Sequence, residues 1–369
     1  MGFTYKICIK PVGTYFLGGE KTFVDDDERA NYRVESRPIP QQTTILGMLR
    51  YALRSGLLSL KNSDDKLELT QLIGAYGFDG TDRPIGIIER LSPLFLWHEK
   101  YGLMEEAGLY FQLEDKEKWT QIQYRPWKAE RVISGVVNRQ ALAPRLLAFD
   151  YKHERPKAWR YKMNERENIL TYDEIFFSKE QVGNLKNRED IDDDKGFFKQ
   201  IRYSMAKEFS FCMYIQTEKE LKENVSFLAF MGGDQSEFRV KIFKEDFSFE
   251  VKLEEYPESE GRVVLLSDCF IPEELLRYCE FALIDTLNFR YIRTLTKMTD
   301  FSDMDRTKYM AFDTDEKRTA VSQLPRKSED IKLVTRGAVF YCHNVNKFVE
   351  GIINHPFHRI GYNYCRIEL

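Results

Sequence analysis

Residues 39–50 read IPQQTTILGMLR, and this stretch predicts the first helix of the chain. Proline is disfavoured inside a helix but fits just before one, so Pro38 and Pro40 place a helix start directly after them. Thr43 or Thr44 can cap that helix. The apolar side chains that follow recur at helical spacing; they are Ile45, Leu46, Leu49 and Leu53. The stretch therefore predicts a helix that begins near Thr44.

The start of this helix carries a dense set of hydrogen-bonding groups. The first N–H groups of a helix have no partner within it, and here Gln41, Gln42, Thr43 and Thr44 add two amides and two hydroxyls. Such a set suits phosphate oxygens and unpaired base edges of RNA. The alternative interpretation is that Thr43 and Thr44 only cap the helix.

The rest of the chain alternates short strands with short helices. Upstream of the helix, residues 3–11 alternate like a strand. Downstream, the patterns predict a helix over 66–74, strands over 85–97, 108–113 and 209–215, a short helix over 217–224, a strand over 225–231, a hairpin over 238–243 and 247–253, a strand over 262–267 and a helix over 272–281. The order from residue 209 fits a ferredoxin-like module with an added hairpin, and the N-terminal half has a looser version with long insertions.

Composition places the chain among ordinary globular proteins. Its 369 residues correspond to roughly two domains of ~150 residues each. We expect an N-terminal domain over 1–204 and a C-terminal domain over 205–369. The net charge is -4, whereas a free-standing nucleic-acid binder is usually basic. This net charge is compatible with a subunit that binds RNA through one local patch and contacts protein partners through its other surfaces. The most basic short stretch with interleaved aromatic residues is 151–166.

The sequence predicts neither a targeting segment nor catalysis through the common enzyme motifs. Residues 1–11 lack a cleavable apolar stretch, and no apolar run approaches ~18 residues, so we expect a cytoplasmic chain with no membrane contact. The six cysteines form no CxxC pair and are expected to be buried reduced thiols; they are Cys8, Cys212, Cys269, Cys279, Cys342 and Cys365. No P-loop, nucleophile elbow, HExxH or Rossmann fingerprint occurs. His355 and His358 flank a proline and lack further ligands, so no metal site and no cofactor are expected.

Several short segments, in order along the chain, resemble one protein family. They are residues 17–23 (LGGEKTF), 39–50, 85–96 (IGIIERLSPLFL), 182–185 (VGNL) with 196–198 (GFF), 230–233 (FMGG), 336–341 (RGAVFY) and 361–363 (GYN). Together they resemble the RAMP superfamily, and within it the third-subunit family of the Cmr complex, the type III-B CRISPR effector. The resemblance spans nearly the whole chain, and its most specific element is the block that opens the helix.

This resemblance implies a fold, a function and partners. Its members have two ferredoxin-like domains, bind the repeat-derived 5′ handle of the crRNA, contact the large polymerase-like subunit and the RAMP backbone subunit, and have no catalysis of their own. The family's thumb, a hairpin that kinks the RNA, maps onto residues 182–202, although NLKNR follows Gly183 here in place of the family pattern. The predicted fold is therefore α+β, with two ferredoxin-like (RRM-like) modules, long insertions and a protruding β-hairpin.

The predicted RNA-binding residues combine the helix start, glycines and basic side chains. Glycine lets the backbone approach RNA closely, although the run that begins at Gly337 is also explained as a core strand after a turn. The predicted residues are Gly18, Gly19, Lys21, Gln41, Gln42, Thr43, Thr44, Arg50, Lys186, Arg188, Arg336 and Gly337.

Two other functions remain open at this point. Other RAMP proteins cleave guide-RNA precursors with a histidine near a glycine-rich loop, and His343, close after Arg336 and Gly337, is the candidate for such an endoribonuclease. The second alternative is a scaffold that does not contact RNA. We expect no catalytic residue and a hetero-oligomeric complex.

Overall fold

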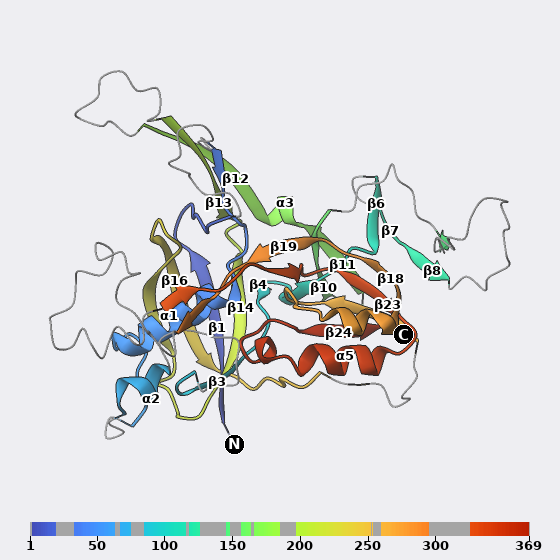
Figure 1. The fold of residues 1–369 in the computed structure, drawn as a ribbon. Coiled ribbons are helices and arrows are strands. Elements are labelled where there is room, and N and C mark those ends of the chain that lie inside the picture. Colours follow the sequence, from blue (N-terminus) through green and yellow to red (C-terminus); the bar gives the residue numbers. More distant parts are fainter. Residues whose placement is uncertain are drawn as a thin grey trace, which may run out of the picture.

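The computed structural model shows a mixed α+β protein, rich in strands (Figure 1). It describes residues 2–19, 33–62, 67–74, 85–115, 118–125, 145–147, 156–163, 166–184, 197–251, 253, 260–294 and 325–368. Two main sheets lie side by side, and a long hairpin projects away from them.

The larger sheet has nine strands and is built around the N-terminal strand. The order is β11-β10-β5-β4-β14-β1-β16-β15, and β3 pairs with β14. The bounds are β1 (Phe3–Pro11), β3 (Ile88–Leu91), β4 (Phe95–His98), β5 (Gly102–Glu106), β10 (Ala158–Met163), β11 (Arg166–Thr171), β14 (Phe209–Thr217), β15 (Val225–Met231) and β16 (Ser236–Lys244). Strand β1 is antiparallel to both of its neighbours. The predicted N-terminal strand is therefore confirmed, and it lies inside the sheet rather than at an edge.

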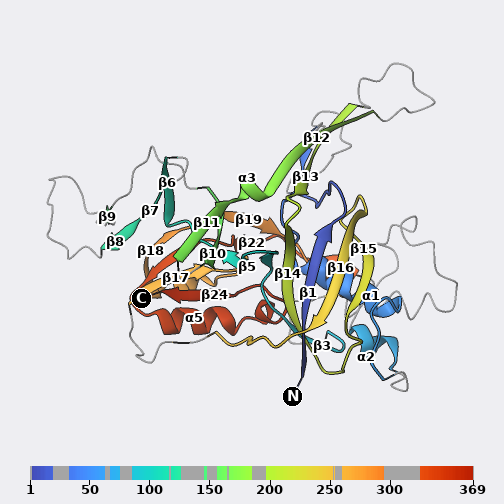
Figure 2. The ribbon, with the colours of Figure 1, turned by 180° about the vertical axis from the view of Figure 1, so that it is seen from behind.

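One face of this sheet is covered by helices α1 (Gln42–Arg54) and α2 (Leu69–Ile73); Figure 2 shows the opposite face. Alternation along β1 points Tyr5, Ile7 and Ile9 into the same core that buries Ile45 and Leu49 of α1. The predicted helix after the two prolines is confirmed. It begins at Gln42, slightly earlier than expected, because Gln41 rather than a threonine occupies the N-cap position.

The second sheet is formed by the C-terminal part of the chain. Its order is β18-β23-β17-β24, with β17 (Gly261–Leu265), β18 (Cys279–Leu283), β23 (Val339–Cys342) and β24 (Cys365–Glu368). The 3-10 helix η2 (Glu273–Tyr278) and helix α5 (Val345–Ile353) contribute Leu275 and Phe348 to its core. In chain order this sheet is built from β17, η2, β18, β23, α5 and β24, with strands outside the sheet between β18 and β23 and a further 3-10 helix before β24. All of its strand pairs are antiparallel.

The two sheets are joined by a shared core and by ion pairs. Phe289, Leu333 and Tyr362 from the C-terminal part belong to the core of the larger sheet. At the junction, the Arg160 guanidinium on β10 lies 3.2 Å from the carboxylate of Glu368 on β24. The described part of the chain is therefore packed as one body.

The hairpin consists of β12 (Phe176–Asn184) and β13 (Phe197–Met205), with the short β2 (Arg33–Glu35) parallel to β13. Helix α3 (Tyr172–Ile175) leads into it. A protruding hairpin thus occupies the position predicted for the thumb, although residues 185–196 lie outside the described residues. The remaining elements are β6 (Phe111–Asp115), β7 (Lys118–Gln121), β8 (Gln123–Arg125), β9 (Arg145–Leu147), β19 (Thr286–Phe289), β20 (Ile292–Thr294), β21 (Pro325–Lys327), β22 (Ile331–Val334) and the 3-10 helix η5 (Pro356–Arg359).

Three predictions for local elements are wrong. Residues 217–224 are not a helix, because tertiary hydrogen bonds to residues 59–61 take over their backbone. Residues 247–250 are not a strand; the Phe247 ring instead stacks on Tyr214 of the sheet at 4.2 Å. The helix over 272–281 is reduced to η2, and strand β18 begins at Cys279. The larger sheet also contains strands from both sides of the expected boundary at residues 204/205.

Among the described residues, no helix has the length and apolar character needed to cross a bilayer.

The anchoring of residues 217–224 can be tested at Tyr5. Its buried hydroxyl accepts a hydrogen bond from the Leu221 N–H (2.7 Å) and lies 3.4 Å from the Leu221 carbonyl oxygen. Tyr5→Phe leaves these buried backbone groups without that partner, so we expect the free energy of unfolding to fall by about 1–3 kcal/mol. Denaturant unfolding measures the change, and Tyr51→Phe, at a ring that is 59% exposed, is the control. Equal stability of both variants would contradict the assigned anchoring.

Candidate nucleic-acid interface

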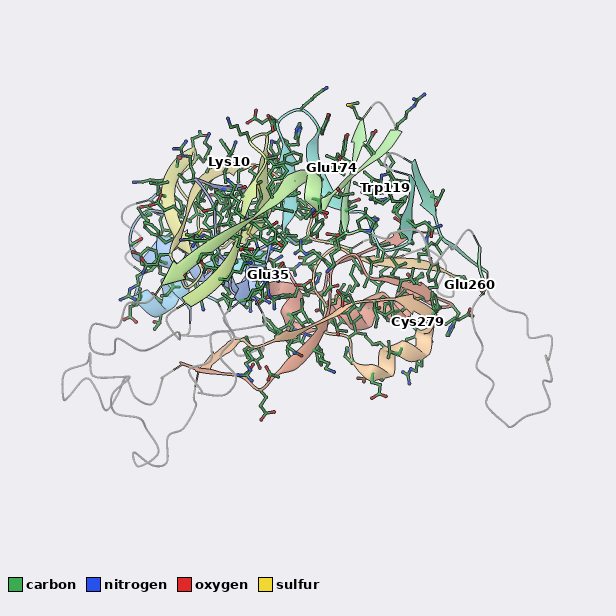
Figure 3. All side chains as sticks on the ribbon, turned by 90° about the horizontal axis from the view of Figure 1, so that it is seen from above. Lys10, Glu35, Trp119, Glu174, Glu260 and Cys279 are labelled. Atoms are coloured by element: carbon green, nitrogen blue, oxygen red, sulfur yellow. The ribbon has the colours of Figure 1, made fainter. Side chains whose placement is uncertain are left out.

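An open cleft of about 930 Å³ lies where the base of the hairpin, the segment before α1 and the loops of the C-terminal part meet. Glu35, labelled in Figure 3, is on its wall. The lining residues are Gly19, Arg33, Glu35, Ser36, Arg37, Pro38, Ile39, Pro40, Gln41, Lys157, Tyr172, Asp268, Asp285, Thr286, Leu287, Thr335 and Arg336. Segments far apart in the sequence thus form one concave surface.

The N-terminal wall is the segment from β2 to the start of α1, and it is held on both sides. The Ser36 N–H donates to the Ile201 carbonyl of the hairpin (2.9 Å), and the Arg37 N–H donates to the Leu17 carbonyl (2.8 Å). Gly19 lies so close to this segment that a Cβ atom there would be 2.2 Å from the Glu35 carbonyl oxygen. The hairpin and this cleft wall therefore form a continuous hydrogen-bonded unit.

The floor of the cleft contains Arg336, a buried arginine in the turn before β23. Its Nη1 donates to the Leu94 carbonyl (3.1 Å), and its backbone N–H donates to the Asp268 carboxylate (3.0 Å). The guanidinium also lies 5.9 Å from the centre of the Trp159 ring, within the range of a cation–π interaction. Arg336 is thus fixed by both parts of the structure, with 6% of its surface exposed.

Behind this floor, Glu106 is a buried carboxyl group next to the arginine. The Tyr172 hydroxyl donates to its Oε2 (2.9 Å). Burial raises the pKa of Glu106 to about 7, although the positive charge of Arg336 and the hydrogen bond from Tyr172 both lower it. Gly337 has a φ of +81°, and a Cβ there would approach the Glu106 carboxylate to 3.1 Å. Glycine at this position therefore gives the turn room beside Glu106.

The opposite wall is formed by residues 285–287 and Thr335, joined by a hydrogen bond from the Thr335 N–H to the Asp285 carbonyl (2.9 Å). Lys157 Nζ lies 3.5 Å from the Asp285 carboxylate. The lining alternates charges of both signs: Arg33, Arg37, Lys157 and Arg336 are basic, and Glu35, Asp268 and Asp285 are acidic. Such a surface can bind phosphates and also accept hydrogen bonds from base amino groups and 2′-hydroxyls.

The cleft gathers some of the residues predicted from the sequence. Gly19, Gln41 and Arg336 line it together. Gln41 is the N-cap residue of α1, and its side chain makes no capping hydrogen bond. The expectation that Thr43 or Thr44 caps the helix is therefore wrong; both are half-buried in its first turn.

Gln42 points into the protein rather than into the cleft. It is 1% exposed, and its amide lies 3.1 Å from the Gly361 carbonyl and 3.4 Å from the Ser92 carbonyl. Both acceptors belong to segments that cross beneath the helix start. Gln42 therefore links α1 to the segments that contain Ser92 and Gly361. Nothing in the sequence indicated that the two adjacent glutamines would differ in this way.

The other predicted residues lie apart from this surface or outside the described residues. Gly18 is exposed next to Gly19. Arg50 is half-buried on α1, where loss of hydration lowers the pKa of its guanidinium. Residues Lys21, Lys186 and Arg188 lie outside the described residues.

Three basic residues of the cleft were not predicted as site residues: Arg33, Arg37 and Lys157. Two of them carried a signal in the sequence. Arg37 directly precedes the Pro-Ile-Pro segment, and Lys157 belongs to the basic stretch 151–166. Their convergence depends on pairing between β2 and the hairpin, which no local pattern indicates.

His343, the candidate of the endoribonuclease alternative, is separated from the cleft. It is exposed beyond the end of β23 opposite to Arg336, and its ring lies 6.5 Å from that of Tyr278. It does not line the cleft. Within the part of the chain that the structure describes, no group of three His, Cys, Asp or Glu side chains is arranged to hold a metal ion.

The chain matches the model of one known protein family. The model of a family described as "CRISPR-associated protein (Cas_Cmr3)" matches residues 7–367. No curated protein matches the chain. Among solved structures, a chain in a cryo-EM structure of type III-B Cmr-beta bound to cognate target RNA is similar, with 13% identity, coverage of 98% of both chains and a TM-score of 0.49. A chain in a second such structure, with target RNA and AMPPnP, has 13% identity, coverage of 98% of this chain and 95% of that one, and a TM-score of 0.47.

The raised pKa of Glu106 predicts a pH-dependent stability. The folded-state pKa of about 7 exceeds the ordinary value of 4.5, so the folded state retains the proton that the unfolded state releases. The contribution of this group to stability therefore falls, by on the order of 3 kcal/mol, as the pH rises from about 4.5 to about 7. Glu106→Gln keeps an acceptor for Tyr172 and does not titrate. We expect this variant to gain stability relative to the parent protein across that pH range, as measured by denaturant unfolding. A difference that does not change with pH would contradict the prediction.

Proposed function

Because the chain belongs to the Cas_Cmr3 family of CRISPR-associated proteins, we propose that it is a non-catalytic subunit of a type III-B effector complex and binds the 5′ handle of the crRNA in the cleft. In this role it caps the handle and bridges the large polymerase-like subunit to the RAMP backbone subunit, within a cytoplasmic hetero-oligomeric complex that acts in antiviral defence. The handle, the partners and the lack of catalysis are what the family resemblance implies.

The observation that carries this proposal is the convergence of Gly19, Gln41 and Arg336 on one cleft. Each comes from a different sequence segment that resembles the family, and nothing local in the sequence brings the three segments together. We therefore propose that this surface, which is assembled from the most family-like segments, binds the family's ligand.

The chemistry of the lining suits single-stranded RNA. Arg33 and Arg37 can meet phosphates, and the Gln41 amide can pair with the edge of an unstacked base. The carboxylates of Glu35 and Asp285 can accept hydrogen bonds from base amino groups or 2′-hydroxyls. The mixed charge favours recognition of a particular RNA segment over general attraction to polyanions, which agrees with the net charge of -4.

We further propose that the hairpin β12–β13 is the thumb that kinks the RNA where the handle ends. Residues 199–201 of β13 pair with residues 33–35 of the cleft wall. RNA that leaves the cleft beside this wall would therefore meet the base of the hairpin. We also propose that the C-terminal sheet is a ferredoxin-like module of the RAMP architecture; its strand order and its antiparallel pairing support this.

The endoribonuclease alternative depends on His343. General-acid catalysis needs a histidine beside the scissile phosphate, and His343 lies beyond the far end of β23 from the cleft. The second alternative is a scaffold that does not contact RNA. It gives no role to the grouping of Gln41 with the basic residues of the cleft.

RNA binding by the cleft can be tested at the start of α1. Gln41→Ala removes an amide that lines the cleft and makes no capping bond, so we expect unchanged stability and a loss of about five- to tenfold in affinity for handle RNA. Arg37→Ala should reduce the salt slope of binding by roughly 0.7 if its guanidinium meets a phosphate. Arg54→Ala, at the exposed other end of α1, is the matched control.

Gln42→Ala serves as the contrast, because its buried amide bonds within the protein. This variant should lower the melting temperature, whereas Gln41→Ala should not. Wild-type affinity for handle RNA in the folded Gln41→Ala and Arg37→Ala variants would remove the cleft from the proposal.

Absence of catalysis is tested directly with purified protein and repeat RNA, in EDTA and in magnesium. We expect no site-specific cleavage, because His343, the histidine that the endoribonuclease alternative names, lies away from the cleft. Cleavage by the parent protein that disappears in His343→Ala would establish the endoribonuclease instead.

A further inference from the structure

Two cysteines, Cys279 on β18 and Cys342 on β23, lie directly opposite each other in the C-terminal sheet. Their sulfur atoms are 3.1 Å apart. The His343 N–H donates to the Tyr278 carbonyl (3.1 Å), so residues 278 and 343 face each other across a ladder hydrogen bond. Positions in an antiparallel ladder alternate, which makes Cys279 and Cys342 a pair without mutual backbone hydrogen bonds. In a regular ladder the Cα atoms of such a pair are about 4.5 Å apart, within the range that a disulfide spans; here the register shifts between Cys279 and Phe281, on the other side of the pair.

The pair is also accessible from one side. Strand β18 is the outermost strand of its sheet, and Cys279, labelled in Figure 3, is half-buried, whereas Cys342 is 4% exposed. Cys279 is therefore the more exposed residue of the pair, and it is the one that a reagent would meet first.

We propose that Cys279 and Cys342 form a reversible disulfide by exchange with a small-molecule disulfide. The Cys279 thiolate attacks one sulfur of that molecule, a mixed disulfide forms, and one small thiolate leaves. The Cys342 thiol then gives up its proton and attacks the Cys279 sulfur, and the second small thiolate leaves. In total, two protein thiols are oxidised to one protein disulfide, and one small disulfide is reduced to two thiols. The sulfur atoms must approach by only about 1 Å to reach bonding distance.

The bond would restrain one wall of the cleft. The segment between the two cysteines, which are 63 positions apart, contains residues 285–287, Thr335 and Arg336 of the lining. Both strands run from the cysteines toward the cleft, where the Thr335 N–H donates to the Asp285 carbonyl. A covalent link at one end of this strand pair and a hydrogen bond at its other end hold the wall as a unit. Closing so long a loop also stabilises the folded state by restricting the unfolded chain.

The experiment uses the full chain and glutathione disulfide. After oxidation, free thiols are alkylated and the protein is digested with trypsin without reduction. Tyr278–Arg290 and Gly337–Lys347 each contain one cysteine, so the bond appears as a single linked peptide pair that dithiothreitol separates. We expect this pair to be the main product and the melting temperature to rise by roughly 5 °C. Amide exchange at residues 330–340 should slow in the oxidised protein.

Two variants make the test specific. Cys279→Ser should abolish both the linked peptides and the rise in melting temperature. Cys8→Ser, in the second cross-strand cysteine pair (Cys8 opposite Cys212), is the matched control and should retain both. The proposal is overturned if Cys279 and Cys342 of the parent protein stay open to alkylation, if Cys279 keeps the glutathione adduct, or if either cysteine links to a different partner.

Discussion

Strand β1 pairs with β14 on one side and with β16 on the other, and this pairing organises the larger sheet. It joins residues 3–9 to residues 211–217 and residues 5–11 to residues 238–244. Because Tyr5, Ile7 and Ile9 are fully buried in this arrangement, a shift in register by one residue would turn them to the outside. The pairing therefore fixes where α1 packs, and with it the position of the cleft wall that precedes α1.

The floor of the cleft contains two buried ionisable groups, and burying such groups is costly in free energy. An arginine and a carboxyl group removed from water lower stability unless hydrogen bonds and an opposite charge compensate. Arg336 has the Leu94 carbonyl and the Trp159 ring as partners, and Glu106 has the Tyr172 hydroxyl. Since Tyr172 also begins the helix that leads into the hairpin, the same contacts connect the floor of the cleft to the protruding hairpin. A positive charge held rigidly beneath an RNA-binding surface would not need to reorganise when a phosphate arrives.

The walls of the cleft differ in how they are held. The N-terminal wall is bound by backbone hydrogen bonds to residue 17 and to the hairpin. The opposite wall is an extension of the strand pair β18–β23, with Cys279 and Cys342 at its far end. Both walls are thus held by elements that extend beyond the cleft itself.

Features that depend on neighbouring residues could be predicted from the amino-acid sequence. Alternation predicted the strand over 3–11, and two prolines followed by apolar residues at helical spacing predicted α1, because proline geometry and side-chain periodicity act locally. The ordered motifs also identified the family, which the family match over residues 7–367 confirms. Other features could not be predicted, because contacts between residues far apart in the chain set them. Residues 217–224 lose their helix to hydrogen bonds with residues 59–61. Gln42 is buried by Gly361 and Ser92, whereas its neighbour Gln41 faces the cleft. Burial of a side chain depends on which remote segments pack against it, and no local pattern contains that information.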